Sequence, residues 1–368
     1  MKEIRIIVSG GGTGGHIFPA ISIANALKAK DPESVKILFV GAEGRMEMER
    51  VPAAGYEIIG LPIRGFDRSN PLNNIKTLWM VVKSMWKARR IVKDFKPMVA
   101  VGVGGYASGP LLRAAATMGV PTVIQEQNSY AGVTNKMLAA KAAKICVAYP
   151  NMERFFPKEK ILLTGNPVRQ DLLEGEDLKR KGQEFYHLDS EKKTLLIIGG
   201  SLGARTINES VMDYLDELEA ANDIQVIWQT GKYYYNSIQE RLKGRALQNV
   251  QVMEFVNKMN YAYACADLII SRAGASSISE LCLLHKAVIL VPSPNVAEDH
   301  QTRNAQALVD KDAAIMIRDV DARKDLMPKA LELIHQTETL NNLSQNIHKL
   351  AQENSAGRIA DEIFKLIK

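Results

Sequence analysis

A glycine-rich segment at residues 9–16, with the sequence SGGGTGGH, constrains this chain more than any other feature. An apolar run at residues 4–8 precedes it and predicts a buried strand, and residues 17–27 follow it with the pattern of a helix. A strand, a glycine loop and a helix start aim backbone N–H groups and the positive end of the helix dipole at an anion. Glycine is needed because a Cβ would block the close approach of a phosphate. The segment predicts an anion-binding loop; the alternative is a tight turn without a ligand.

Short apolar runs alternate with helical stretches along the whole chain. In the first half, further strands are predicted at residues 35–40, 56–59, 98–103, 121–124, 144–147 and 161–163. The pattern restarts with a strand at 194–198 and a second glycine loop, GGSLGAR, at 199–205, and strands follow at 224–228, 250–256, 268–271, 287–291 and 313–317. Such alternation is typical of parallel sheets covered on both faces. We expect an α/β protein with two Rossmann-like domains whose parallel sheets face each other across a cleft.

The length of 368 residues agrees with two domains. We expect an N-terminal domain at 1–164, a linker at 165–170, a C-terminal domain at 171–350, and a last helix at 351–368 that can pack back on the first domain. The net charge of +6 suits anionic substrates or an anionic membrane surface and is too small to indicate nucleic acid.

The cysteines and the first residues bear on the cellular compartment. Cys146, Cys265 and Cys282 lie far apart in apolar surroundings, which is typical of buried, reduced thiols in a cytosolic protein. The chain enters a strand at once without a signal-peptide pattern, and its longest uncharged run is broken by glycine and proline. We therefore expect a cytoplasmic protein that reaches a membrane only through a surface patch.

The richest cluster of the second half is SRAGASSISE at residues 271–280. A helix is predicted to begin near Ala275, so the N–H groups of Ala275, Ser276 and Ser277 would point at a diphosphate. Glu280, one turn into that helix, can accept two hydrogen bonds from a ribose diol. The alternative is a capping box, in which Ser276 or Ser277 caps the helix and Glu280 completes the box.

Three other polar segments are candidates for binding. The amides of QEQN at residues 125–128 suit sugar hydroxyls, the fork of Arg169 suits a phosphate, and His300 and Gln301 follow a predicted strand end. Their alternatives are a polar loop, a surface salt bridge and a solvated loop.

The histidines have no metal-ligand spacing and no P-loop motif occurs, so we expect neither a metal nor a cofactor. The spacing of Gly10, Gly12 and Gly15 also satisfies the dinucleotide fingerprint, but the acidic residue that it requires is absent from the second strand. An NAD-linked oxidoreductase is therefore the first rival function.

A helix predicted at residues 73–95 carries two apolar faces. Ile75, Trp79, Val82 and Trp86 share one face, and a row of lysine and arginine residues runs along its edge. Tryptophan beside a basic row suits an anionic membrane surface. The alternative is a helix that is buried on both sides.

Six motifs together resemble the MurG family. They are GGGTGGHIFP at 10–19, GVGGYASGP at 102–110, EQNSYAGVTN at 126–135, GNPVR at 165–169, GGSLGAR at 199–205 and SRAGASSISE at 271–280. The resemblance implies a two-domain GT-B fold on the cytoplasmic face of the inner membrane. It also implies inverting transfer of N-acetylglucosamine from UDP-N-acetylglucosamine (UDP-GlcNAc) to the 4-hydroxyl of undecaprenyl-diphosphate-linked N-acetylmuramoyl-pentapeptide, in peptidoglycan synthesis.

The resemblance also implies roles for individual residues. Thr13, Gly14, Gly15 and Asn128 would contact the donor region, and Arg169 and Ser201 its diphosphate. The backbone of Val256 would hold uracil, and Gln301 would bind the hydroxyls of GlcNAc. Glu280 would bind the ribose. The helix start before it would line the phosphates through Ala275, Ser276, Ser277, Ile278 and Ser279. The chain departs from the family in having Gln125 where histidine is frequent and His300 where an amide is expected.

Displacement at the sugar carbon needs a base for the acceptor hydroxyl and stabilisation of the leaving diphosphate. His16 is the first candidate base because imidazole titrates near neutral pH, and Glu126 is the second. A purely structural His16 is the alternative. Besides the oxidoreductase, the rival functions are a non-catalytic sugar-nucleotide binder at the membrane and another GT-B enzyme, such as a diacylglycerol glycosyltransferase.

Overall fold

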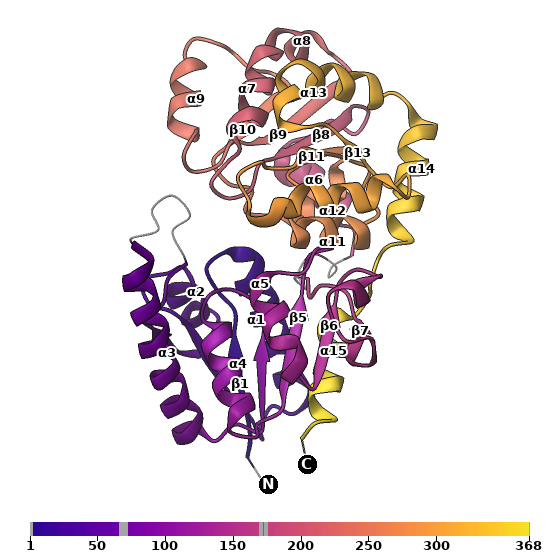
Figure 1. Ribbon diagram of the computed structural model, residues 1–368. Coiled ribbons are helices and arrows are strands. Elements are labelled where there is room, and N and C mark those ends of the chain that lie inside the picture. Colours follow the sequence, from indigo (N-terminus) through magenta and orange to yellow (C-terminus); the bar gives the residue numbers. More distant parts are fainter. Residues whose placement is uncertain (1–2, 66–72, 169–171, 173–175, 368) are drawn as a thin grey trace. The chain divides into compact units, whose positions relative to one another are not determined.

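The computed structural model describes residues 3–65, 73–168, 172 and 176–367 (Figure 1). The chain forms two compact units. The first comprises Met1–Val168 together with Gln352–Lys368, and the second comprises Arg169–Ala351. Two sequence predictions lie outside the description, namely Arg169 and the side chain of Ile75.

The first unit contains a seven-stranded parallel sheet in the order β3-β2-β1-β4-β5-β6-β7. Its strands are β1 (Ile4–Ser9), β2 (Val35–Ala42), β3 (Glu57–Leu61), β4 (Val99–Gly102), β5 (Thr122–Glu126), β6 (Lys144–Val147) and β7 (Ile161–Leu163). Successive residues of the central strand β1 point to opposite faces, and both faces are buried. Ile7 belongs to one apolar cluster, whereas Ile6 and Val8 belong to the other. This explains why the strand is a continuous apolar run rather than an alternating one.

Helices cover both faces of this sheet. They are α1 (Gly14–Lys30), α2 (Glu47–Ala53), α3 (Asn73–Phe95), α4 (Ser108–Thr117), α5 (Val133–Leu138) and α15 (Ser355–Phe364), with short 3₁₀ turns η1 (Ala139–Lys141), η2 (Met152–Arg154) and η3 (Lys158–Lys160). Buried residues of α3 and α4 pack on the face that holds Ile7, and those of α1 and α15 pack on the face that holds Val8.

The second unit contains a six-stranded parallel sheet in the order β10-β9-β8-β11-β12-β13. Its strands are β8 (Lys193–Ile198), β9 (Ile224–Gln229), β10 (Val250–Met253), β11 (Leu268–Ser271), β12 (Val288–Leu290) and β13 (Ile315–Met316). Its helices are α6 (Leu178–Tyr186), α7 (Arg205–Asp213), α8 (Leu215–Ala220), α9 (Tyr235–Arg241), α10 (Met259–Cys265), α11 (Ala275–Leu283), α12 (His300–Val309), α13 (Asp319–Leu333) and α14 (Thr337–His348), with the 3₁₀ turn η5 (Ala297–Asp299). Each unit is thus a Rossmann-like α/β domain, as the alternating pattern predicted.

The end of the chain returns to the first unit. α14 belongs to the second unit, whereas α15 packs on α1 and places Ile359, Ala360 and Ile363 in the apolar cluster of β1. Arg358 fixes this segment by donating from Nη2 to the carbonyl of Thr164 at 2.7 Å.

Some element boundaries differ from the sequence predictions. α1 begins at Gly14, so part of the glycine loop already forms its first turn. β5 extends through Gln125 and Glu126, which lie in the strand and not beyond it. β10 ends at Met253, which leaves Val256 in the following loop. Among the described residues, the apolar stretches of the helices are all too short or too polar to cross a bilayer.

Candidate active-site loops

The first glycine loop connects β1 to α1 and is shaped by close packing. A Cβ on Gly10 would lie 2.9 Å from the carbonyl oxygen of His16, and one on Gly11 would lie 2.2 Å from Glu47. Gly12 has a φ of +87°, a backbone conformation that strongly favours glycine. Thr13 is extended and caps α1, and its carbonyl accepts the N–H of His16 at 3.1 Å. The loop therefore brings the first amides of α1 to the edge of the sheet, as the sequence predicted.

Glu47 holds this loop in place, and no motif in the sequence singled it out. Its side chain is fully buried, with a relative exposure of 0%. One carboxylate oxygen accepts the N–H of Gly12 at 2.9 Å, and the other accepts the N–H of Ala42, at the end of β2, at 3.0 Å. A buried carboxyl group that accepts these two N–H groups ties the glycine loop to the end of β2. The sequence offers no local signal for this role, because Glu47 looks like any acidic residue in the first turn of a helix.

His16 lies where the loops after β1 and β4 meet. Its Nδ1 and the hydroxyl of Thr13 share a hydrogen bond of 3.2 Å. A Cβ on Gly104 would lie 2.8 Å from Nε2 of His16, and one on Gly105 would lie 2.4 Å from the carbonyl oxygen of Gly11. The glycines of the segment GVGGYASGP thus allow the second loop to approach the first. The imidazole lies between the hydroxyl of Thr13 and the backbone of Gly104.

Glu126 organises the loop after β5. Its side chain is only 2% exposed. One oxygen accepts the backbone and side-chain N–H groups of Asn128, at 3.0 and 3.2 Å, and the other accepts the N–H of Gly132 at 3.0 Å and Nδ2 of Asn135 at 2.8 Å. These four donors occupy the lone pairs that a base would need. The carboxylate also determines where the side chain of Asn128 lies.

Three buried amides connect the loop after β5 to its neighbours. Gln127 donates to the carbonyl of Val103 at 2.7 Å, Asn166 donates to the carbonyl of Gln127 at 3.0 Å, and Gln125 donates to Oδ1 of Asn166 at 2.9 Å. The side chains of Gln125 and Gln127 also form a short contact with each other. Position 125, where the family frequently has histidine, is therefore a structural position in this chain.

The candidate residues of the second unit lie at the carboxyl edge of its sheet. β8, β11 and β12 are neighbours in the sheet, so the loops that follow them meet at one edge. In the loop after β8, Gly200 and Gly203 have φ values of +86° and +92°, and a Cβ on Gly203 would lie 2.2 Å from the carbonyl oxygen of Thr230. Ser201 is exposed on this loop, and its carbonyl accepts the N–H of Lys232 at 3.1 Å.

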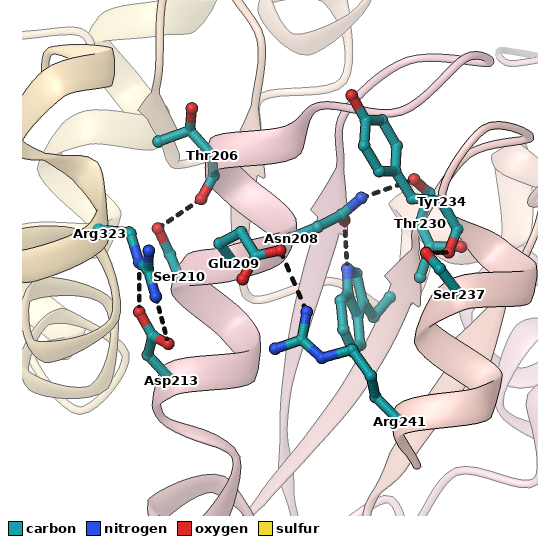
Figure 2. A network of polar contacts seen from close by, with 11 residues as sticks. Thr206, Asn208, Glu209, Ser210, Asp213, Thr230, Tyr234, Ser237, Arg241 and Arg323 are labelled. Atoms are coloured by element: carbon teal, nitrogen blue, oxygen red, sulfur yellow. Dashed lines mark hydrogen bonds and ion pairs between the residues drawn. The ribbon is translucent and has the colours of Figure 1, made fainter. Parts of the chain in front are cut away.

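The helix that follows this loop, α7, is anchored on several sides (Figure 2). Asn208 donates to the carbonyl of Thr230 at 2.8 Å and accepts from the buried indole of Trp228 at 3.0 Å. On the outer side, Asp213 forms a two-bond ion pair with Arg323, and Glu209 pairs with Arg241 at 3.1 Å. These contacts fix α7 from its middle to its last residue, and α7 begins directly after the second glycine loop.

The start of α11 has the geometry of an anion site. Gly274 is extended and precedes Ala275, the first residue of the helix. Ile278 is buried, and Ser279 donates to the carbonyl of Ala275 at 3.0 Å. The Ser276 hydroxyl oxygen has no hydrogen-bond partner among the residues that the structure describes. Gly274 stands at the N-cap position and makes no side-chain cap, so the amides of Ser276 and Ser277 lie at a helix start that suits an anion.

Glu280 on α11 and Arg272 in the loop before it connect the start of α11 to neighbouring elements. Glu280 is buried, and Oε2 accepts the hydroxyl of Tyr263, on α10, at 3.2 Å. Arg272 forms an ion pair with Asp319 and donates to the carbonyls of Val291 and Pro292, both at 3.1 Å. Arg272 thus joins the loops after β11 and β12. The sequence predicts a role for Glu280 but offers no signal for Tyr263 or for this role of Arg272.

Two predicted contacts of the second unit already have partners within the unit. The N–H of Val256 donates to Oε1 of Gln229 at 2.9 Å, and Nε2 of Gln229 donates to the carbonyl of Gly200 at 3.1 Å. Gln301, near the start of α12, accepts the N–H of Ser293 at 2.8 Å. The predicted residues of this unit that the structure describes, from Ser201 to Gln301, therefore lie in or near loops at the carboxyl edge. In the described part of the chain, His, Cys, Asp and Glu form no group of three or more that could hold a metal ion.

The helix α3 has one exposed apolar face. Trp79 and Trp86 are 69% and 70% exposed, and Val82 is also exposed. Ala88, Ile91 and Val92, on the other side, belong to the core. The helix is therefore not buried on both sides. Lys83 and Arg90 are exposed along the same helix, and Lys87 forms an ion pair with Glu43 at 2.9 Å.

Comparison with protein families and with curated proteins agrees with this geometry. Residues 6–147 match the glycosyltransferase family 28 N-terminal domain, and residues 194–363 match its C-terminal domain. The UDP-N-acetylglucosamine--N-acetylmuramyl-(pentapeptide) pyrophosphoryl-undecaprenol N-acetylglucosamine transferase of Parabacteroides distasonis is 62% identical over 367 residues, covering 100% of this chain and 99% of that protein. The transferase of the same name from Cytophaga hutchinsonii is 54% identical over 366 residues, covering 100% and 98%.

Solved structures show the same fold. MurG from Acinetobacter baumannii superposes with a TM-score of 0.79 at 28% identity, covering 98% of this chain and 99% of that one. A UDP-GlcNAc 2-epimerase from Neisseria meningitidis, at 13% identity and a TM-score of 0.70 over 99% and 100% of the two chains, shares the fold alone. The prediction of two Rossmann-like domains of the GT-B type is confirmed, and an oxidoreductase is not favoured. With full-length relatives at this level of identity, the chain belongs to the MurG family of glycosyltransferases.

Proposed function

We propose that this chain transfers N-acetylglucosamine from UDP-GlcNAc to the 4-hydroxyl of lipid-linked N-acetylmuramoyl-pentapeptide, with inversion at the anomeric carbon. The observation that carries the proposal is the identity of 62% with a curated transferase over the full length of both chains. The loops at the carboxyl edge of each sheet supply the chemistry, because ligands of open α/β sheets bind outside the strand ends.

The second unit binds the donor in this proposal. The amides of Ala275, Ser276 and Ser277 receive the diphosphate at the start of α11, where the helix dipole favours negative charge. Ile278 supports this turn from the core, Ser279 lies beside it, and Ser201 approaches from the neighbouring loop. Arg169 would add a cation to the diphosphate.

The same unit recognises the nucleoside and the sugar. Glu280 accepts the ribose hydroxyls, and Tyr263 orients its carboxylate. Because the N–H of Val256 already donates to Gln229, uracil would bind the carbonyl of Val256 or take the place of the Gln229 side chain. Gln301 binds GlcNAc hydroxyls through its amide N–H groups, since its oxygen accepts from Ser293.

The first unit presents the acceptor hydroxyl. A base at Nε2 of His16 requires the proton at Nδ1, where it donates to the hydroxyl oxygen of Thr13. Nε2 then takes the proton of the 4-hydroxyl as that oxygen bonds to the anomeric carbon and the bond from this carbon to the diphosphate oxygen breaks. The electron pair leaves with UDP, and the amides of α11 stabilise its charge. Gly14, Gly15 and Asn128 line the same edge.

Glu126 acts in this proposal as a positioning residue rather than as a base. Its carboxylate accepts four hydrogen bonds from its own loop, and removing one of them to accept a substrate proton would release the loop. Asn128 and Asn135 depend on it for their positions.

The test of the proposed function uses the purified chain, radiolabelled UDP-GlcNAc and lipid-linked N-acetylmuramoyl-pentapeptide in detergent micelles. We expect the label to enter the lipid fraction with release of one UDP per sugar, and we expect Glu280→Gln to raise the KM of UDP-GlcNAc. Consumption of UDP-GlcNAc without labelled lipid, or no consumption at all, would contradict the proposal. Addition of NAD in place of UDP-GlcNAc should give no reaction.

We further propose that the chain docks on the cytoplasmic face of the inner membrane through α3. Trp79, Val82 and Trp86 are exposed, with Ile75 predicted on the same face, and basic side chains lie beside them. Tryptophan enters the interfacial layer, and each basic residue near an anionic surface contributes about 1 kcal/mol.

Flotation with vesicles of anionic phospholipid tests this docking. The double variant Trp79→Glu and Trp86→Glu should lose most binding, whereas Tyr233→Glu with Val320→Glu, which alters two exposed residues of the second unit, should retain it. Equal binding by both double variants, with the circular dichroism of the wild type, would rule out docking through α3.

A further inference from the structure

The first unit contains a cavity of about 550 Å³ between helices α3, α4 and α5. This volume lies within the range of small-molecule sites, roughly 300–1,000 Å³. Its apolar wall comes from all three helices and includes Val81, Met85, Leu112, Ala116, Met137 and Leu138. Arg64, Arg113 and Lys141 also line it, and none of the described lining residues is acidic. The cavity thus combines an apolar interior with positive charge.

The cavity shares walls with the loops of the candidate site. Tyr106 and Gly109 line it and belong to the segment after β4, whose Gly104 packs against His16. Val133 and Thr134 also line it, and they follow the loop that Glu126 holds. A molecule whose polar head lies at these loops can therefore extend an apolar tail directly into the cavity.

From this continuity we propose that the cavity binds the first part of the isoprenoid chain of the acceptor, the part next to the diphosphate. The inference rests on the proposed function. The three basic side chains are complementary to the diphosphate that joins the chain to the sugar. One of them, Arg64, is oriented by a hydrogen bond from Nε to the hydroxyl of Thr77 at 3.3 Å.

The acceptor is favoured over a bulk phospholipid by the position of the cavity. The exposed residues of α3, Trp79 and Trp86, project from the surface and suit a membrane interface, but they do not line the cavity. The cavity is lined by other residues of that helix, Val81 and Met85, together with the segments next to His16 and Glu126. The acceptor is the membrane amphiphile whose head group the proposed reaction brings to those segments.

The test compares two acceptors with the same head group in detergent micelles, one with an undecaprenyl chain and one whose chain is shortened to a single isoprene unit, which leaves most of the cavity empty. The measured quantity is the ratio of kcat/KM for the long chain to kcat/KM for the short chain. We expect the wild type to favour the long chain. Ala116→Phe, which fills the cavity, and Met137→Glu, which places a charge on an exposed wall residue, should lower the ratio about tenfold or more, toward one.

Matched controls lie next to the wall. Thr117→Phe and Met118→Glu add the same groups at exposed positions that do not line the cavity, and both should keep the ratio of the wild type. A wild type without chain preference, or wall variants with an unchanged ratio, would overturn the inference. If Ala116→Phe loses binding to phospholipid vesicles but keeps the wild-type ratio of the two kcat/KM values, the cavity binds a membrane phospholipid. That result would also overturn the inference. Failure of the wild type with both acceptors would instead contradict the proposed function.

Discussion

At the scale of single residues, Glu47 shows how a buried carboxylate can shape a loop that it does not belong to. Its oxygens accept the N–H groups of Gly12 and Ala42, and the side chain has no contact with solvent. Removing an acceptor from a buried pair leaves an N–H unsatisfied. Because Gly12 precedes the first turn of α1, movement of this loop would also displace Thr13 and His16.

We predict that Glu47→Gln lowers the free energy of unfolding by about 1–3 kcal/mol, because the amide retains only one acceptor atom for two N–H groups. The kcat should fall as well, since the loop that leads into the first turn of α1, where His16 lies, loses its support. Urea denaturation and steady-state kinetics measure the two effects. Glu49→Gln, an exposed residue of the same helix, is the control, and a Glu47→Gln variant with the kcat of wild type would show that the bond does not position the loop.

A second prediction at this scale concerns His16. If Nε2 accepts the proton, His16→Ala should lower kcat by about 10²–10⁴-fold, with a small effect on the KM of UDP-GlcNAc. Added imidazole should restore part of the lost rate, which a purely structural histidine would not allow. Near-normal turnover of His16→Ala or His16→Gln at saturating substrate would exclude the role.

The sequence predicts residues that belong to local motifs and misses those defined by distant partners. The glycines of the first loop and Glu280 were recognisable because strand, loop and helix follow one another directly. Glu47 bonds a residue 35 positions away, Gln229 one 27 positions away and Tyr263 one 17 positions away. Such pairs form only after strands and helices pack, and one sequence does not show which elements become neighbours.

At the scale of elements, α10 supports the part of α11 where we propose that the nucleotide binds. The hydroxyl of Tyr263, on α10, donates a hydrogen bond to Glu280, on α11, and both side chains are buried. The first residue of a helix is not always predictable from the spacing of its apolar residues. α1 was predicted from its apolar residues and therefore too late, because its first turn consists of Gly14, Gly15 and His16.

We predict that Tyr263→Phe weakens the discrimination between UDP and 2′,3′-dideoxy-UDP, because Glu280 loses the donor that orients it towards the ribose. Stability should fall by about 1.5–3 kcal/mol, the usual range for a hydrogen bond to a charged group. Dissociation constants for the two nucleotides measure the effect, with Tyr261→Phe on the same helix as the control. If Tyr263→Phe loses stability but still discriminates between the two nucleotides, Tyr263 has only a structural role.

At the scale of the whole molecule, the alternation of strands and helices predicted two parallel α/β units because buried strands are continuous apolar runs. The strand orders were not predictable in the same way, since they depend on crossovers that the pattern does not encode. The described chain also shows a discontinuous first unit. Its last helix, α15, is separated from the rest of that unit by the second unit in sequence.

This discontinuity predicts where a mutation at the end of the chain acts. Ile363 is fully buried against α1 and β1, so Ile363→Ala should lower the stability of the first unit by about 2–5 kcal/mol. Hydrogen exchange measures each unit by itself, and β1 and α1 should lose protection while β8 and α7 keep theirs. Val320→Ala, an exposed residue of the second unit, is the control and should change neither. Equal loss of protection in both sheets would mean that the two units unfold together, and α15 would then stabilise the whole chain rather than the first unit alone.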